Sequence, residues 1–189
     1  NSNPNPKDEG DPAYESFLVV TFPKDEMRIL DYNRVVRDLN GLEPGELLER
    51  LAVNFGMTDC KSPARPDARG RFAMYLEGRW RMLTLRQAPP EGVNPVQRLD
   101  VSLLYDLVLA PLLGIGDPRT DGRIDFVGGM RGLEGLAARV DSGEMAAAFA
   151  LYPTAMDDLM AVAEAGEVMP PKSTWFEPKL ADGLVCRMI

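Results

Sequence analysis

Hydrophobic positions in the first half of the chain follow the two-residue repeat of β-strands. The apolar runs Phe17–Phe22 and Met27–Tyr32 flank a short turn sequence, which predicts a β-hairpin. A second hairpin is predicted from Arg71–Glu77 and Arg79–Arg86 around Gly78, because apolar residues alternate on one face of each strand. The first half of the chain is therefore expected to supply two β-hairpins.

Two other segments, one in the first half of the chain and one just after it, are predicted to be helical. Pro44 suits the first position of a helix that runs to about Asn54. The apolar positions of that helix are Leu47, Leu48, Leu51 and Phe55. Asp100 is predicted to cap a second helix, with Leu104, Leu107 and Val108 facing inward. Pro111 ends or kinks this helix because its ring clashes with the carbonyl of Leu107.

The last third of the chain alternates between the two periods. Ile124–Val127 and Ala146–Leu151 predict strands, and the segment between them has apolar residues at i, i+3, i+4 and i+7. Thr154, with Asp157 three residues later, predicts the start of another helix. The expected inward positions of this helix are Met156, Leu159, Met160 and Ala163. A final strand is predicted at Leu184–Met188.

These elements predict a mixed α/β fold, α+β in the broad sense. Two β-hairpins are followed by a β-α-β-α-β unit, all on one mixed sheet. Residues 1–16 are polar and proline-rich and are expected to be a flexible lead-in. Residues 17–189 are expected to form one domain, and the proline-rich segment 89–95 also allows a division into a hairpin-rich half and a β-α-β-α-β half.

Composition narrows the function classes. The net charge is 21 − 29 = −8, which disfavours non-specific binding to nucleic acid. Histidine is absent, so this chain has no Ser-His-Asp triad, no histidine acid–base catalysis and no histidine metal ligand. No apolar run approaches a membrane span and no signal peptide is visible. Two cysteines, Cys60 and Cys186, suit a reducing compartment, and the cytoplasm is expected.

The segment Met169–Lys179, which we call the proline platform, is the strongest candidate site. Pro170 and Pro171 stiffen the backbone ahead of a cation and two hydroxyls, so the groups would be ordered before a ligand arrives. The predicted anion-binding residues are Lys172, Ser173, Thr174 and Lys179. The alternative is a stiff crossover whose hydroxyls bond to nearby backbone.

Asn33 and Arg34 form a second candidate anion site. Alternatively, Arg34 pairs with Asp31 or Asp38 and has only a structural role. Two weaker candidates have a favoured structural reading as well. Gly128-Gly129 suggests either an anion at a helix start or a plain turn, and the basic strip at residues 61–86 suggests either a nucleotide or acidic partner or a solvated hairpin face.

The proline platform and the following Leu180–Val185 resemble the closing signature of a bacterial family, domain-of-unknown-function family 1015. The stretches Leu30–Gly41, Leu99–Tyr105 and Val140–Glu144 agree with that resemblance. Tyr105 and Cys186 stand where members of the family often have histidine.

The resemblance implies that this chain is the C-terminal half of a longer protein. The N-terminal half of family members carries an Asp-Gly-His-His-Arg motif similar to one in ParB/sulfiredoxin-like proteins, a superfamily that includes kinases of free serine. The motif is absent here, so the resemblance implies that the catalytic residues lie in the missing N-terminal half, which is the expected partner. It also implies ATP or ADP with magnesium in the full-length protein and no cofactor in this chain.

Three functions stay open on the sequence. The first is the C-terminal domain of a small-molecule, free-serine-like kinase, inactive alone, that contributes anion contacts but no catalytic residues. The second is a structural or oligomerisation domain without a ligand of its own. The third is a regulatory module that senses an amino acid. The sequence predicts neither a nucleic-acid nor a membrane partner, and it does not indicate the oligomeric state.

Overall fold

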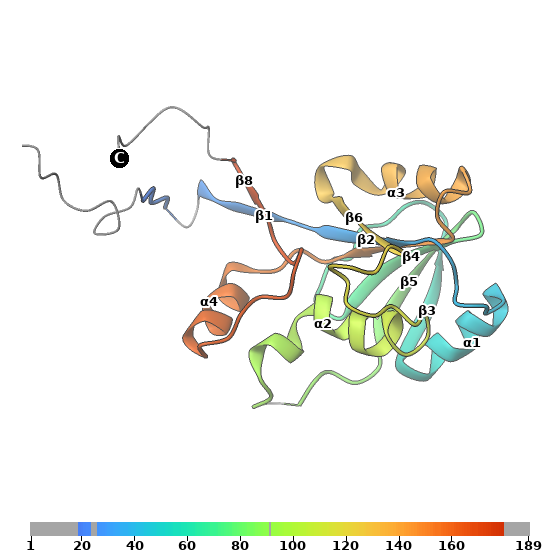
Figure 1. The fold of residues 1–189 in the computed structure, drawn as a ribbon, viewed down its shortest axis with the longest axis horizontal. Helices are drawn as coiled ribbons and strands as arrows, with labels where there is room; N and C mark the ends of the chain where they lie inside the picture. Colours follow the sequence, from blue (N-terminus) through green and yellow to red (C-terminus); the bar gives the residue numbers. More distant parts are fainter. Residues whose placement is uncertain (1–18, 24–25, 91, 180–189) are drawn as a thin grey trace, which may run out of the picture.

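A six-stranded antiparallel sheet forms the centre of the molecule (Figure 1). The computed structural model describes residues 19–23, 26–90 and 92–179, so the predicted lead-in and the predicted final strand lie outside the described residues. The strand order is β3-β5-β4-β7-β2-β6. The strands are β2 (Tyr32–Val36), β3 (Phe55–Cys60), β4 (Arg71–Leu76), β5 (Arg79–Leu85), β6 (Ile124–Gly128) and β7 (Ala147–Leu151).

Helices cover both faces of this sheet (Figure 1). They are α1 (Pro44–Asn54), α2 (Asp100–Leu104), α3 (Gly132–Asp141) and α4 (Met156–Glu164). A π-helical turn, Tyr105–Leu109, continues α2. In Figure 1, α1 and α2 lie on one side of the sheet and α3 on the other.

Each face of the sheet has its own hydrophobic cluster. The larger cluster joins α1 and α2 to the sheet through Leu51, Phe72 and Leu104, all fully buried. The smaller cluster joins α3 to the opposite face through Leu136 and Ala148. Burial of apolar side chains at about 25 cal/mol per Å² is the main force that holds these layers together.

The strand β2 lies between β7 and β6, and its side chains alternate between the two clusters. Val36 belongs to the α1–α2 cluster and Val35 to the α3 cluster. Because successive side chains of a strand point to opposite faces, Arg34 shares the face of Val36, and Asn33 shares the face of Val35. The two adjacent candidate residues therefore lie on opposite sides of the sheet.

The first predicted hairpin is wrong. Residues 19–23 form no strand, and β1 (Arg28–Leu30) pairs instead with β8 (Trp175–Glu177) of the proline platform. This two-stranded ribbon extends from the end of β2 beyond the six-stranded sheet (Figure 1). A nonlocal contact outweighs the local turn because the Trp175 ring is anchored on Gly128, which brings β8 to β1.

The second predicted hairpin is confirmed. β4 and β5 pair from Arg71↔Thr84 to Leu76↔Arg79. Glu77 and Gly78 have positive φ values of 51° and 73°, which is the left-handed pair that a tight two-residue hairpin turn requires.

Among the predicted helices, α1 is confirmed from Pro44 to Asn54. The strand β3, which begins directly after it at Phe55, is not predicted by the sequence. The predicted cap of α2 is wrong by one residue, because the Asp100 carboxylate accepts a hydrogen bond from Gly70 N at 2.8 Å instead.

The predicted start of α4 is also wrong by one residue. The helix is preceded by Ala155, whose N–H donates to Asp158 at 3.1 Å, while the Thr154 hydroxyl donates to the Ser173 carbonyl at 3.0 Å. Met160 is exposed, and Val162 is the buried residue of this helix. The predicted inward face is partly wrong: Met156 and Leu159 are half-buried, whereas Ala163 is exposed like Met160, and α4 packs against the 3-10 turn Pro95–Arg98.

The mixed α/β class is confirmed, although every strand pairing among the described residues is antiparallel. β6 and β7 are joined through α3, and β2 lies between them. Strands from both sides of residues 89–95 share the sheet, and the domain boundaries themselves stay a prediction.

The free energy of unfolding is expected to fall as the pH rises from about 4 to about 6, because of Asp100. Burial raises the pKa of Asp100 from 3.8 to about 6, and one carboxylate oxygen is buried without a hydrogen-bond partner. Over this range the unfolded chain loses its proton first, so up to about 3 kcal/mol of stability is lost, and the loss is complete above pH 6.

Asp100→Asn should remove this penalty and keep the acceptor for Gly70 N. Urea unfolding at pH 4 and pH 7 would measure the difference between the variant and the wild type at each pH. We expect the variant to gain stability relative to the wild type at pH 7 only. An equal difference at both pH values would contradict the prediction. Arg69 and Asp158, which form an ion pair near Asp100, shift the pKa of Asp100 in opposite directions.

Candidate functional site

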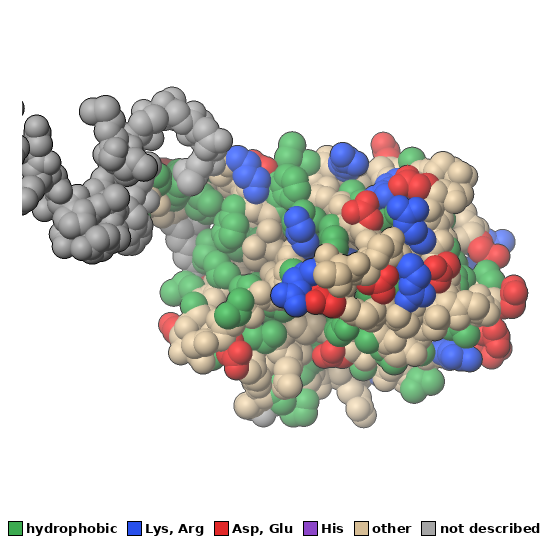
Figure 2. Space-filling view, viewed as in Figure 1, with side chains coloured by type: hydrophobic (Ala, Val, Ile, Leu, Met, Phe, Trp, Pro, Cys, Tyr) green, Lys and Arg blue, Asp and Glu red, His purple; other side chains and the backbone are tan. Residues whose placement is uncertain are grey.

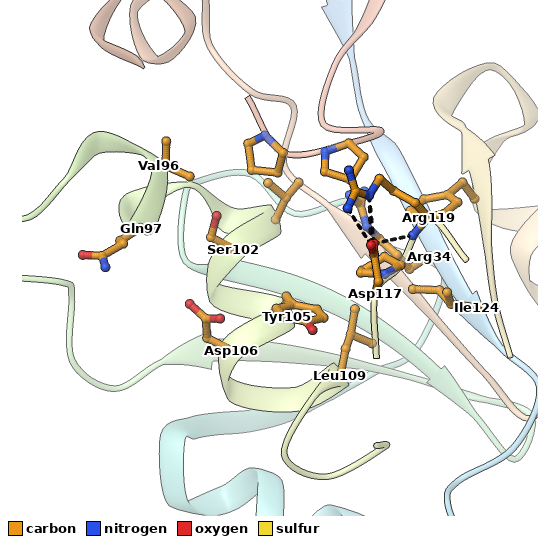
Figure 3. A pocket seen from close by; sticks show the side chains of 15 residues that line it. Arg34, Val96, Gln97, Ser102, Tyr105, Asp106, Leu109, Asp117, Arg119 and Ile124 are labelled. Carbon is orange, nitrogen blue, oxygen red and sulfur yellow. Dashed lines mark hydrogen bonds and ion pairs between the residues drawn. The ribbon is translucent and has the colours of Figure 1, made fainter. Parts of the chain in front are cut away.

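A cleft of about 530 Å³ opens on the α1–α2 side of the sheet (Figure 3). The platform residues Pro170 and Pro171 form one wall, and Val101, Tyr105 and Leu109 form another. The remaining lining residues include Arg34 from β2, Ile124 and Phe126 from β6, and Asp117, Pro118 and Arg119 from the preceding loop. The lining is mostly apolar with a few polar groups, as in small-molecule sites.

Arg34 is the buried charge of this central cleft. Only 4% of the residue is exposed, and its guanidinium lies 5.2 Å from the centre of the Phe126 ring. It donates hydrogen bonds to the carbonyls of Tyr32 and Lys172, the latter at 2.9 Å. None of the ion pairs found among the described residues involves Arg34, so the alternative that it pairs with Asp31 or Asp38 is wrong.

Arg34 nevertheless keeps its charge at neutral pH. Burial lowers the pKa of Arg34 from 12.5 to about 10, which is still well above 7. A buried cation whose partners are two carbonyl dipoles and an aromatic ring is incompletely compensated, because a charge taken out of water is expensive unless it meets an opposite charge. The central cleft therefore presents a fixed positive charge that a ligand anion can neutralise.

The proline platform is held to the sheet at several points. The Trp175 ring lies 5.4 Å from the Tyr32 ring and packs directly over Gly128. Arg34 bonds the backbone of Lys172, and Thr154 bonds the backbone of Ser173. The platform is thus a fixed wall of the central cleft.

The predicted platform residues have different environments. Lys172 is exposed, with a positive φ of 55°, and its amine lies 5.7 Å from the centre of the Tyr32 ring. It lines a second cavity of about 390 Å³, which shares Arg119, Phe126 and Pro171 with the central cleft. The structure therefore brings Lys172 and Arg34 to neighbouring cavities.

The other platform residues lie away from this cavity pair. Ser173 is buried at 5% exposure, and Thr174 is half-buried. Lys179 is exposed, and its amine lies 4.6 Å from the centre of the Trp175 ring. None of the three lines the central cleft, and their role as ligand contacts stays a prediction.

Asn33 is fully buried, and both ends of its amide are used within the protein. Its Nδ2 donates to Asp31 at 2.5 Å, and its Oδ1 accepts from Leu151 N at 3.0 Å. Asp31 in turn accepts from Arg65 at 3.1 Å. Asn33 lies on the face opposite the cleft, so its geometry is that of a structural residue that fixes β2 against β7.

Gly128 and Gly129 serve close packing. A Cβ on Gly128 would lie 2.6 Å from the Trp175 ring, and one on Gly129 would lie 2.2 Å from the Asp31 carboxylate. α3 begins only at Gly132, after a 3-10 turn, so these glycines are not at its first turn. The hypothesis that this pair binds an anion is therefore unsupported. Glycine is required at both positions because a larger side chain would have no space.

Most of the basic strip at residues 61–86 is neutralised internally. The ion pairs are Arg65–Asp31, Arg69–Asp158, Arg71–Asp67 and Arg81–Asp59. Arg86 donates to a carbonyl of α1. On the face shown in Figure 2, acidic and basic side chains are interspersed over the sheet, while hydrophobic ones gather beside α4 and the β1–β8 ribbon.

Several cleft residues were not predicted from the sequence. Phe126 and the Asp117–Arg119 loop carry no motif, and only the fold brings them to Arg34. Tyr105 lies at the start of the π-helical turn, where the wider turn changes which side chains face the cleft, and its hydroxyl donates to Gly116 at 2.7 Å. The sequence feature that could have pointed to Tyr105 is its place in the Leu99–Tyr105 stretch, which agrees with the family resemblance.

Two classes of feature are not found in the part of the chain that the structure describes. No described helix is long and apolar enough to cross a membrane. The described residues also include no group of three or more His, Cys, Asp or Glu side chains that could hold a metal ion.

No curated protein matches the chain. Among solved structures, a free serine kinase in complex with AMP aligns at 18% identity and a TM-score of 0.46, covering 84% of this chain and 57% of that chain. A mutant free serine kinase in complex with ADP covers the same shares at 18% identity and a TM-score of 0.44. A conserved hypothetical protein from Pyrococcus furiosus aligns at 18% identity and a TM-score of 0.47, covering 84% of this chain and 60% of that one.

The chain thus spans less than two thirds of the length of these structures. A family model described as "Protein of unknown function (DUF1015)" matches residues 1–102. The matched part contains the Leu30–Gly41 stretch, including Arg34, and ends within the Leu99–Tyr105 stretch, before the proline platform. Because the match covers just over half of the 189 residues, the chain belongs to the family of proteins of unknown function DUF1015.

Proposed function

We propose that this chain is the C-terminal domain of a longer small-molecule kinase and that it binds an anionic group of the substrate or nucleotide in the central cleft. Arg34 supplies the charge, the prolines and Phe126 supply an apolar wall, and the residues that carry out the chemistry come from the N-terminal half. The isolated chain is then a binding domain without activity.

One observation carries this proposal: a buried guanidinium faces a cleft, and none of the described carboxylates pairs with it. A guanidinium can bind a carboxylate or phosphate through two parallel hydrogen bonds. Because the two carbonyl bonds and the rigid platform fix its position, little ordering is needed when a ligand arrives.

The resemblance to the kinases implies ATP or ADP with magnesium. We assign no metal ligand to this chain: the described residues contain no group of three or more His, Cys, Asp or Glu side chains that could hold a metal ion. The nearby carboxylates Asp117 and Asp121 are engaged by Arg119 and Arg123. The role assigned to this chain is to bind and orient an anion.

Arg34→Met should lower the affinity for an anionic ligand at least tenfold, because one charge-assisted contact is worth about 1.5–3 kcal/mol. Isothermal titration of the 189-residue chain with ADP, inorganic phosphate and L-serine would measure this. The melting temperature should change little, because the loss of two hydrogen bonds is offset by removal of a buried charge.

Arg50→Met is the matched control, since Arg50 is exposed on α1 and does not line the cleft. Arg34→Lys, which keeps the charge but loses the two-pronged geometry, should bind with intermediate affinity. Equal binding by wild type and Arg34→Met, with both folded, would overturn the proposal. The ligand-free alternative, an oligomerisation domain, predicts no binding and a concentration-dependent mass in sedimentation.

The fragment part of the proposal has its own test, which is the reading frame upstream of Asn1. An Asp-Gly-His-His-Arg sequence in that frame would support the N-terminal half as partner. A start codon directly before Asn1 would contradict it.

A further inference from the structure

A second arginine, Arg119, lines the same cleft but is held by a carboxylate of its own loop. Its Nε donates to both oxygens of Asp117 at 3.0 Å, and its Nη2 donates to one of them at 2.6 Å (Figure 3). The Arg119 side chain is 70% exposed and that of Asp117 is 39% exposed. The pair therefore lies at the mouth of the cleft, in contact with water.

Arg119 and Arg34 border the same part of the central cleft. The Arg34 guanidinium lies over the Phe126 ring. Phe126 also lines the neighbouring cavity, together with Arg119. Pro171, next to the residue whose carbonyl Arg34 bonds, also lines both cavities. Figure 3 shows both arginines and the Asp117 carboxylate at one end of the cleft.

We propose that Asp117 pairs with Arg119 only until a ligand arrives. Arg119 and Arg34 then bind the same doubly charged group, such as a phosphate monoester. The inference rests on the proposed function and narrows it: the ligand of the cleft is a phosphorylated small molecule, and a singly charged carboxylate would engage Arg34 alone. Arg119 is then the residue that determines this specificity.

The exchange is favourable on electrostatic grounds. An exposed ion pair contributes little to stability, so its loss is easily offset. A phosphate dianion between two guanidiniums gains charge-assisted hydrogen bonds from both, whereas the Asp117 carboxylate is a single negative charge. Arg119 holds the pKa of Asp117 down to about 2, so Asp117 is ionised at neutral pH and would repel a bound dianion unless its side chain turned away.

The loop can allow that rotation without unfolding. The Asp117 carbonyl accepts hydrogen bonds from the amides of Thr120 and Asp121 at 3.0 and 2.9 Å, and these two bonds do not involve the carboxylate. The carboxylate itself also accepts from Arg119 N at 3.0 Å, and this bond is lost when the side chain turns away. Asp121 is in turn fixed by Gly116 N and Arg123. The exchange therefore moves the side chains of Asp117 and Arg119 and exposes one backbone N–H, that of Arg119, to water or to the ligand.

Binding of inorganic phosphate at pH 8 and of acetate, measured by isothermal titration of the 189-residue chain, tests the inference. Arg119→Gln should lower the phosphate affinity about tenfold and leave acetate binding unchanged. Asp117→Asn should raise the phosphate affinity severalfold, because Arg119 no longer has a competing carboxylate. Arg50→Gln is the control for loss of an exposed arginine.

The outcomes separate the inference from the proposed function. If Arg34→Met abolishes phosphate binding while Arg119→Gln and Asp117→Asn bind like the wild type, the inference is wrong and the proposed function stands. If the wild type binds acetate but not phosphate, the inference is wrong and the proposed function stands. If Arg34→Met binds both anions like the wild type, or the wild type binds neither saturably, both are wrong. Equal losses of phosphate and acetate in Arg119→Gln would also contradict a specificity role.

Discussion

Replacement of Gly129 by alanine is expected to destabilise the protein by about 3 kcal/mol, because the added methyl group has no space. Its carbon would lie 2.2 Å from Oδ1 of Asp31 and 3.0 Å from the Asp31 carbonyl, to which Gly129 N donates at 2.8 Å. Relief of this clash requires displacement of a buried carboxylate that also bonds Asn33 and Arg65. Urea unfolding would measure the loss.

Gly45→Ala is the matched control for this substitution. Gly45 lies in α1, where an added Cβ meets nothing within 4 Å. Alanine is the better helix former, so the control should be stabilised by at most about 1 kcal/mol. An unfolding midpoint for Gly129→Ala equal to that of the wild type would show that Asp31 can move freely.

Asn33→Asp is expected to destabilise the protein by about 3 kcal/mol or more at pH 7. The substitution places a second carboxyl group 2.5 Å from Asp31 on a residue that is fully buried. Two carboxylates at this separation cannot both ionise easily, so the pair would hold a proton that the unfolded chain has released. The loss should therefore shrink as the pH falls toward 4, where the unfolded carboxyls also become protonated.

Asn40→Asp is the control, since Asn40 is exposed and its positive φ of 56° is tolerated by aspartate as well. We expect it to change stability by less than about 1 kcal/mol. Urea unfolding at pH 4 and 7 distinguishes the two. A loss in Asn33→Asp that does not depend on pH would show that the Asp31 contact is not the cause.

These two positions matter for the candidate site because they fix the strand that carries Arg34. Gly129 N donates to the Asp31 carbonyl, and the Asn33 amide donates to the Asp31 carboxylate. Asp31 lies directly before β2. Arg34 itself follows Asn33 and points to the opposite face. Variants at Gly129 and Asn33 are expected to lose stability, whereas Arg34→Met is expected to lose ligand affinity.

The local signals of the sequence were sufficient for several elements. Pro44 begins α1, and the Glu77-Gly78 turn joins β4 to β5, because each depends on backbone preferences of adjacent residues. The proline platform was recognised as stiff, and its prolines do line the central cleft. The polar pair at the end of a strand also indicated Arg34 as a candidate anion contact, and this role stays a prediction.

Only the tertiary structure decided the partners of these elements. The partner of β1 is β8, roughly 150 residues away, because the Trp175 ring fits over Gly128, and no local pattern encodes that fit. Asn33 and Arg34 look alike as polar neighbours in the sequence. Burial and the two-residue period of β2 place one in an internal hydrogen-bond network and the other in a cleft.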